Sequence, residues 1–191
     1  MKKTISIYGG GWVGAPLAFK LALADFDVRV SASSVHQQAA HPKIKVLDFR
    51  AEPDMPAENW SAINDSEVQI WAIPPRRKKN AEETYLAILQ DWVDNLPVGS
   101  AKKLIFLSST SVYSNVSDTV DENSGINEDS LMAKAEAIVS SSKVPSVILR
   151  LAGLMGGDRY VAKYFSGKRN DGANCPINYV HKDDVVALIA L

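Results

Sequence analysis

The apolar and polar positions along the chain alternate between short extended runs and longer helical repeats. Patterns typical of strands occupy residues 4–8, 28–31, 43–48, 68–73, 104–107 and 147–151. Apolar residues at helical spacing predict helices over 12–24, 80–96 and 131–140, and a last helix from about 183. This alternation predicts an α/β fold with a doubly wound parallel sheet and helices on both faces.

The segments between these elements are predicted to be loops. The longest is the polar stretch 108–130, which has the length and composition of a loop that carries function. A glycine-rich loop is predicted at 153–157, and a short extended piece at 177–180 leads into the last helix. No linker or internal repeat interrupts the pattern, so residues 1–191 are expected to form a single domain.

The composition agrees with a folded domain and excludes some partners. The chain has 191 residues, of which 46% are hydrophobic and 23% are charged, enough to bury a core. The 21 Lys and Arg residues nearly balance the 22 Asp and Glu residues, and the net charge of -1 provides no field that attracts nucleic acid. We therefore expect no nucleic acid as partner, which leaves a small-molecule substrate or no partner at all.

The cysteine and histidine residues argue against a disulfide framework and a metal site. The single Cys175 cannot form an internal disulfide, and the three histidines are scattered along the chain, so no metal is expected. No apolar run approaches the roughly 20 residues that span a bilayer, and the Met-Lys-Lys start leads directly into a strand pattern. We expect a cytoplasmic protein without signal peptide or membrane anchor.

The spacing Gly9-x-Gly11-x-x-Gly14 falls where the first predicted strand passes into the first predicted helix. In such a loop the first glycine allows a sharp turn, the second lets a pyrophosphate approach the backbone, and the third lets the helix pack on the strand. The helix N-terminus then faces the anion. In this context the motif predicts the dinucleotide-binding loop of a Rossmann-type fold, with a tight turn that binds nothing as the alternative.

The end of the second strand bears on the form of the dinucleotide. Enzymes that use NAD usually have an acidic residue there, about 20 residues after the glycines, which binds the ribose hydroxyls. This chain has Ser31, Ser33 and Ser34 instead. Hydroxyl groups can accept the 2′-phosphate of NADP, which a carboxylate would repel. The sequence thus slightly favours NADP and leaves NAD open, since no arginine directly follows the strand.

Six segments together resemble the extended, or atypical, short-chain dehydrogenase/reductase superfamily, in its NAD-dependent epimerase/dehydratase branch. They are residues 9–14, 46–48, 71–75, 108–113, 150–156 and 178–185. The segment 178–185, Asn-Tyr-Val-His-Lys-Asp-Asp-Val, is close to the family's NxVHVDDVA segment, and 108–113 is similar to its SSTxVYG segment. The resemblance implies a Rossmann-type sheet with a minimal or absent C-terminal substrate lobe, of which residues 153–182 would be a remnant.

The resemblance also implies which residues contact the cofactor. Trp12 and Val13 belong to the glycine loop, and Asp48 matches the Asp that holds the adenine amino group. The strand end that passes under the cofactor in the family corresponds here to Ala72, Ile73 and Pro74.

The family's chemistry needs a Ser or Thr that binds a substrate oxygen, a Tyr that exchanges its proton, and a Lys that lowers the Tyr pKa and holds the ribose. By resemblance, Ser109 and Lys134 take the first and last of these roles. The Tyr of Tyr-x-x-x-Lys is replaced by Ser130. An aliphatic hydroxyl is too weak an acid to replace a phenol. Atypical members commonly lack this tyrosine.

Four other features have both a functional and a structural interpretation. Tyr113 is expected to pack under its loop rather than act as a replacement acid. His181 is expected to brace its loop while Asp183 caps the last helix. Arg159 would clamp a substrate phosphate or form a surface ion pair, and the basic run 76–79 would meet an acidic ligand or start a solvated helix.

Two hypotheses of function follow from these residues. The first is an NAD(P)-binding epimerase/dehydratase-like oxidoreductase that acts on a sugar nucleotide or another small carbonyl or hydroxyl compound. The second is a non-catalytic protein that senses NAD(P), which the missing tyrosine favours. The resemblance also implies a homodimer formed through the helices predicted at 80–96 and 131–140.

Overall fold

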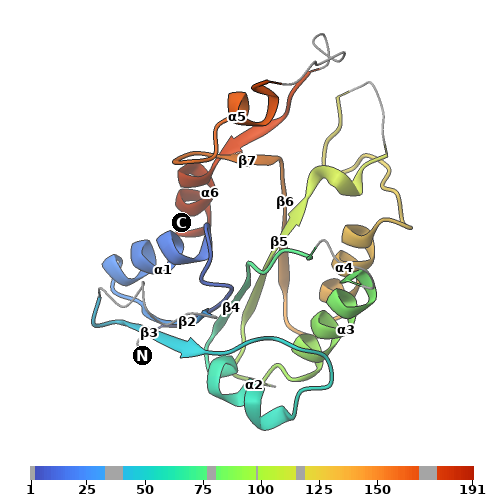
Figure 1. The fold of residues 1–191 in the computed structure, drawn as a ribbon. Helices are drawn as coiled ribbons and strands as arrows, with labels where there is room; N and C mark the ends of the chain where they lie inside the picture. The colour runs from blue at the N-terminus through green and yellow to red at the C-terminus, as the bar shows by residue number, and fades with distance from the viewer. Residues whose placement is uncertain (1–2, 33–40, 77–80, 98, 115–118, 168–175) are drawn as a thin grey trace.

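The computed structural model describes residues 3–32, 41–76, 81–97, 99–114, 119–167 and 176–191 (Figure 1). Six parallel strands form the central sheet in the order β3-β2-β1-β4-β5-β6. They are β1 (Thr4–Tyr8), β2 (Asp27–Ala32), β3 (Ile44–Asp48), β4 (Val68–Trp71), β5 (Lys103–Ser109) and β6 (Ser146–Leu151). A separate pair of parallel strands consists of β7 (Gly153–Met155) and β8 (Tyr179–His181).

Helices cover both faces of the central sheet (Figure 1). They are α1 (Gly14–Leu23), α2 (Ala57–Asn64), α3 (Ala81–Asp94), α4 (Leu131–Ser140) and α6 (Lys182–Ile189), with a 3-10 turn η2 (Thr110–Val112) after β5. The short helix α5 (Val161–Phe165) lies beside β7, away from the central sheet (Figure 1). The strand order reverses between β1 and β4, which is the topology of doubly wound dinucleotide-binding domains. The predicted Rossmann-type α/β fold is confirmed.

The two faces of the sheet have different cores. The face covered by α1 and α6 is aliphatic, with Leu17 and Val30 fully buried. The face covered by α2, α3 and α4 is aromatic, and Tyr8 lies at its centre, stacked on Trp71 at 5.4 Å between ring centroids. Trp92 from α3 packs edge-on against Tyr8 at 5.4 Å. Burial raises the pKa of the Tyr8 phenol far above its usual value.

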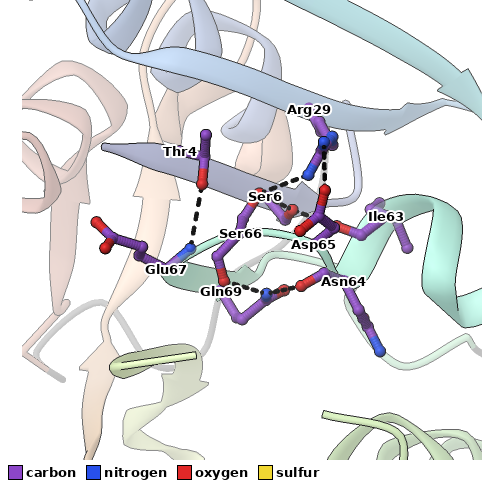
Figure 2. Close-up of polar contacts among 9 residues, drawn as sticks. All are labelled: Thr4, Ser6, Arg29, Ile63, Asn64, Asp65, Ser66, Glu67 and Gln69. Carbon is purple, nitrogen blue, oxygen red and sulfur yellow. Dashed lines mark hydrogen bonds and ion pairs between the residues drawn. The ribbon is translucent and has the colours of Figure 1, made fainter. Parts of the chain in front are cut away.

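Polar side chains enter this aromatic face beside the turn from α2 to β4 (Figure 2). Ser6 in β1 is fully buried, and its hydroxyl is bonded to the Ile63 carbonyl and to Ser66 Oγ, the latter at 2.8 Å. The Gln69 amide donates to the carbonyl of Ser66 at 2.8 Å. Arg29 reaches the same turn and pairs with Asp65 at 2.9 Å. The bonds of Ser6 and Gln69 satisfy groups that would otherwise be costly to bury, whereas the Arg29–Asp65 pair is exposed.

The described strands and helices agree with the predicted ones within a residue or two at each end. The predicted loop at 153–157 is wrong in its first half, because residues 153–155 form β7 and pair with β8. The predicted loop at 108–130 starts too early, because Ser108 and Ser109 still belong to β5. The short helices α2 and α5 were not predicted, because neither has an extended apolar repeat.

Candidate functional site

The predicted site residues come together at the carboxyl edge of the central sheet. The glycine loop follows β1, and the ends of β2 and β3 lie in register, with Ala32 opposite Asp48. Residues 72–74 follow β4, and Ser109 is the last residue of β5. Ser33 and Ser34 lie outside the described residues. Ligands of doubly wound sheets bind at this edge, where the strand order reverses.

The three glycines of the motif, Gly9, Gly11 and Gly14, differ in what a side chain at each position would meet. Gly9 has φ +100°, and a Cβ there would lie 3.1 Å from the backbone carbon of Ala72. A Cβ on Gly14 would lie 2.0 Å from the Gly9 carbonyl oxygen, so only glycine lets α1 pack on the end of β1. A Cβ on Gly11 would meet nothing within 4 Å. That open space at Gly11 fits the close approach of a pyrophosphate.

The N-terminus of α1 is free of groups that would repel or replace an anion. Val13 stands at the N-cap and provides no side-chain hydrogen bond, and the first turn contains no acidic residue. The N–H groups at a helix start carry partial positive charge, although in α1 the Ala15 N–H already donates to the Gly11 carbonyl at 3.0 Å and Pro16 has no N–H. Together with the space at Gly11, this end of the helix fits the phosphates of a dinucleotide.

Ser31 holds the glycine loop against the end of β2. It is 3% exposed, and its Oγ accepts a hydrogen bond from the Gly9 N–H at 2.8 Å, while its carbonyl accepts from the Gly10 N–H at 2.6 Å. Ser31 was predicted to contact the cofactor, and the structure shows it bracing the loop. The sequence does not reveal this role, because the bond joins residues far apart in the chain.

The segment after β4 is fixed directly under the loop. The Ala72 N–H donates to the Tyr8 carbonyl at 2.8 Å, which extends the pairing of β1 and β4. The Ile73 carbonyl accepts from Trp71 Nε1 and from the Tyr85 hydroxyl, both at 3.1 Å. Pro74 is exposed. These bonds hold residues 72–74 beside Gly9, where the resemblance places the floor of a cofactor site.

The residues that the resemblance marks as catalytic lie at the end of β5 and in the first turn of α4. Ser109 is half-buried, and its Oγ accepts from the Ser111 N–H at 3.1 Å, so its own proton is free to be donated. Ser130, at the position of the family's tyrosine, is the N-cap of α4 and accepts from the Ala133 N–H at 3.2 Å. Lys134 is exposed on α4.

A buried charged network lies next to these residues. Glu136 in α4 is 5% exposed and accepts from the Ser108 hydroxyl at 2.6 Å and from Arg150 Nη2 at 2.9 Å. Arg150 also donates to the Tyr113 hydroxyl at 3.0 Å. Hydrogen bonding to Glu136, and then to Tyr113, raises the pKa of the Arg150 guanidinium further above its usual value. The network ties α4 to β5 and β6, and the predicted packing of Tyr113 is confirmed.

His181 is the last residue of β8 and directly precedes α6. Its Nδ1 accepts from the Asp183 N–H at 3.2 Å, so His181 itself is the N-cap of α6. The prediction that Asp183 caps this helix is wrong, because the helix begins at Lys182 and Asp183 lies in its first turn. A Cβ on Gly156 would lie 2.6 Å from His181 Nε2, so the glycine lets the β7 end lie on the imidazole.

The described residues have neither a candidate metal centre nor a membrane-spanning helix. They contain no group of three or more His, Cys, Asp and Glu side chains that could hold a metal ion. Within the same residues, none of the helices has the length and apolar character needed to cross a membrane.

No protein-family model matches the sequence, whereas individual proteins do. Protein YeeZ from Escherichia coli strain K12 is 32% identical over 198 residues, covering 99% of this chain and 72% of YeeZ. The solved structure of UDP-N-acetylglucosamine 4-epimerase from Bacillus cereus is similar with a TM-score of 0.71 at 16% identity, covering 100% of this chain and 73% of that one. The enzyme WbmG from Bordetella bronchiseptica, solved with NAD and UDP, has a TM-score of 0.74 at 14% identity and covers 98% and 67%.

The sheet order, the glycine loop and these structural matches define a Rossmann-type class of domain, with the fold of UDP-N-acetylglucosamine 4-epimerase and WbmG. Within that class, the chain belongs to the family of protein YeeZ.

Proposed function

We propose that the chain binds a nicotinamide dinucleotide at the glycine loop and acts as an epimerase/dehydratase-like oxidoreductase. The substrate would be a sugar nucleotide or another small carbonyl or hydroxyl compound. One observation carries the binding part: Gly11 leaves open space beside an α1 N-terminus that has neither a side-chain cap nor an acidic residue. The structures of UDP-N-acetylglucosamine 4-epimerase and WbmG add support through their shared fold.

The residues of the chain would divide the work by position. Backbone N–H groups of the loop and of the first turn of α1 would bind the pyrophosphate, and residues 72–74 would lie under the cofactor. A bound nicotinamide would exchange a hydride with the substrate. Ser109 would donate a hydrogen bond from its hydroxyl to the substrate oxygen and polarise it, since its Oγ already accepts from the Ser111 N–H. Lys134 would hold the ribose.

The binding test uses a matched pair of measurements. The protein as purified is examined by native mass spectrometry for a retained nucleotide, and then titrated calorimetrically with NAD and with NADP. We expect binding of at least one form, and a clear loss with Gly11→Ala, whose Cβ would enter the open space. Absence of heat with both nucleotides, together with no retained nucleotide, would refute the proposal.

The preference for NADP is a finer part of the same proposal. At the end of β2, Ser31 stands where enzymes that use NAD usually have a carboxylate. Its hydroxyl accepts a hydrogen bond from the Gly9 N–H. We expect a somewhat lower Kd for NADP than for NAD. Equal affinity, or tighter binding of NAD, would contradict this preference without affecting dinucleotide binding.

A second candidate function is a non-catalytic NAD(P) sensor. The observation that favours it is the use of the Ser130 hydroxyl as the cap of α4, so the position of the family's tyrosine serves the helix. Ser130→Tyr supplies a phenol four residues before Lys134, and Ser130→Ala removes the cap without adding one. The wild type and both variants are compared for oxidation or reduction of the bound nicotinamide. A reaction with Ser130→Tyr alone would show a site that lacks only its acid. Absence of turnover in all three proteins, despite nucleotide binding, would favour the sensor.

A homodimer through α3 and α4 is proposed on the resemblance alone. The two helices pack against each other and present exposed polar residues, including Glu82 and Lys134. Sedimentation of the purified chain would decide between a dimer and a monomer.

A further inference from the structure

Two cations lie over the one aromatic ring of the glycine loop. The guanidinium carbon of Arg159 is 4.4 Å from the centroid of the Trp12 ring, and Lys182 Nζ is 5.1 Å from it. Arg159 follows β7, and Lys182 is the first residue of α6. Helix α6 lies beside α1 (Figure 1). Residues from opposite ends of the chain therefore meet at the proposed phosphate loop.

The backbone of Arg159 is held firmly although its side chain is exposed. Its N–H donates to the Gly156 carbonyl at 3.0 Å, and its carbonyl accepts from the Gly156 N–H at 2.7 Å. Gly156 in turn lies on His181, the N-cap of α6. The turn is thus anchored to α6, while the guanidinium extends from it to Trp12.

The positive charges of Arg159 and Lys182 are not neutralised by close ion pairs with described carboxylates. Among the residues that the structure describes, no carboxylate forms an ion pair with Arg159, and Lys182 has only a 3.9 Å contact with Asp183. The neighbouring end of α1 is also positive and lacks an acidic residue. The contact with the half-buried Trp12 ring does not use the N–H donors of the Arg159 guanidinium, and a guanidinium binds phosphate oxygens through two parallel hydrogen bonds.

We infer that Arg159 is a cofactor-binding residue that contacts the pyrophosphate of the dinucleotide, with Lys182 adding charge nearby and Trp12 holding the guanidinium in place before binding. This inference rests on the proposed function. It extends the phosphate site from the glycine loop to the β7–β8 unit, so that binding of the cofactor would also fix that unit on α1.

The test is calorimetric titration of the full chain and its variants with NAD, NADP, ADP and adenosine. Arg159→Gln is expected to raise the Kd for the better-bound dinucleotide about tenfold, and for ADP by a similar factor, because each loses a charge-assisted contact to phosphate. The affinity for adenosine, which has no phosphate, should not change. Arg159→Lys should fall between the wild type and Arg159→Gln, since it keeps the charge and loses the planar fork.

Lys163→Gln on the neighbouring helix α5 is the matched control, because it removes one exposed positive charge from the same region. We expect it to leave every Kd unchanged. If it weakens binding as much as Arg159→Gln, general charge explains the effect and the inference is overturned. Thermal unfolding of each variant shows whether it is folded.

The remaining outcomes separate the two proposals. Failure of the wild type to bind any dinucleotide refutes the proposed function and the inference together. Normal dinucleotide binding by Arg159→Gln refutes only the inference. A further titration with UDP covers the other source of a diphosphate: a loss for UDP with unchanged NAD and NADP binding would assign Arg159 to a nucleotide-sugar substrate and overturn its assignment to the cofactor.

Discussion

The two halves of the carboxyl edge differ in what their polar groups do. In the half built from β1 to β4, backbone N–H groups, glycines and an uncapped helix end leave space and partial charge for a ligand. In the half built from β5, α4 and β6, Ser130 caps a helix, and the charges of Glu136 and Arg150 satisfy each other. The first half is arranged for an outside partner and the second mainly for internal contacts.

On the proposed function, this difference separates the geometry of binding from the chemistry of proton transfer within one fold. A dinucleotide loop depends on backbone shape, which a few glycines determine. A general acid depends on one side chain and its pKa, so a single replacement removes it. The four predictions below test how separate the two halves are.

The largest effect is expected from Glu136→Ala, in the half built from β5, α4 and β6. It leaves the Arg150 guanidinium without its main partner, and because that side chain is only 20% exposed we expect a loss of about 3 kcal/mol in the free energy of unfolding. Denaturant titration measures it, with the exposed Glu83→Ala as control. If the variant stays folded, its dinucleotide affinity should match the wild type; a marked loss would mean that the two halves are coupled.

The second largest loss of stability is expected from Gly14→Ala, in the half built from β1 to β4. Its Cβ would lie 2.0 Å from the Gly9 carbonyl oxygen, so α1 must shift, at a cost of about 2 kcal/mol in stability and most of the dinucleotide affinity. Gly11→Ala is the comparison, since its Cβ meets no protein atom. It should lower affinity with little change in stability. Equal destabilisation by both variants would contradict the separate roles of the two glycines.

Ser31→Ala should have a smaller effect on the same loop. The Gly9 N–H would lose its buried acceptor, which we expect to cost about 1.5 kcal/mol and to weaken dinucleotide binding. Ser61→Ala makes the same chemical change at an exposed hydroxyl in α2 and should have almost no effect. Chemical denaturation and calorimetry test both variants. Unchanged dinucleotide affinity in Ser31→Ala would show that the loop keeps its shape without this brace.

The smallest effect is expected from Ser130→Ala. Loss of the hydroxyl that caps α4 should lower stability by about 1 kcal/mol and leave dinucleotide affinity unchanged. Ser140→Ala, at the other end of the same helix, is the control. A thermal melt followed by circular dichroism gives the comparison, and a stability equal to that of the wild type would rule out the capping role.

The sequence predicted the fold because its strands and its longer helices have clear periodic patterns. The apolar repeat of 131–140 predicted α4 with both ends correct. The short helix α2 was missed because only Trp60 and Ile63 mark its buried side. β7 was mistaken for loop because three residues beside glycines show no periodicity, and its pairing with β8 depends on a distant segment.

The candidate site was predictable where backbone shape decides it. The spacing of the glycines alone indicated three separate roles, and the structure shows close contacts at Gly9 and Gly14 and open space at Gly11. The partners of Ser31 and Arg159 were not predictable, because Gly9 and Trp12 lie far from them along the chain. The pairing of Glu136 with Arg150 was hidden for the same reason: it depends on how α4 lies against β6.

The pairing of the central strand also has a consequence for biosynthesis. Ile5 in β1 faces Val28 on one side and Val68 on the other, so one neighbour is available early in synthesis and the other much later. Until β4 has left the ribosome, one edge of β1 is uncovered and Tyr8 lacks its stacking partner Trp71. The nascent chain is therefore expected to be most prone to aggregation in this interval, because unpaired strand edges and apolar surface are then exposed together.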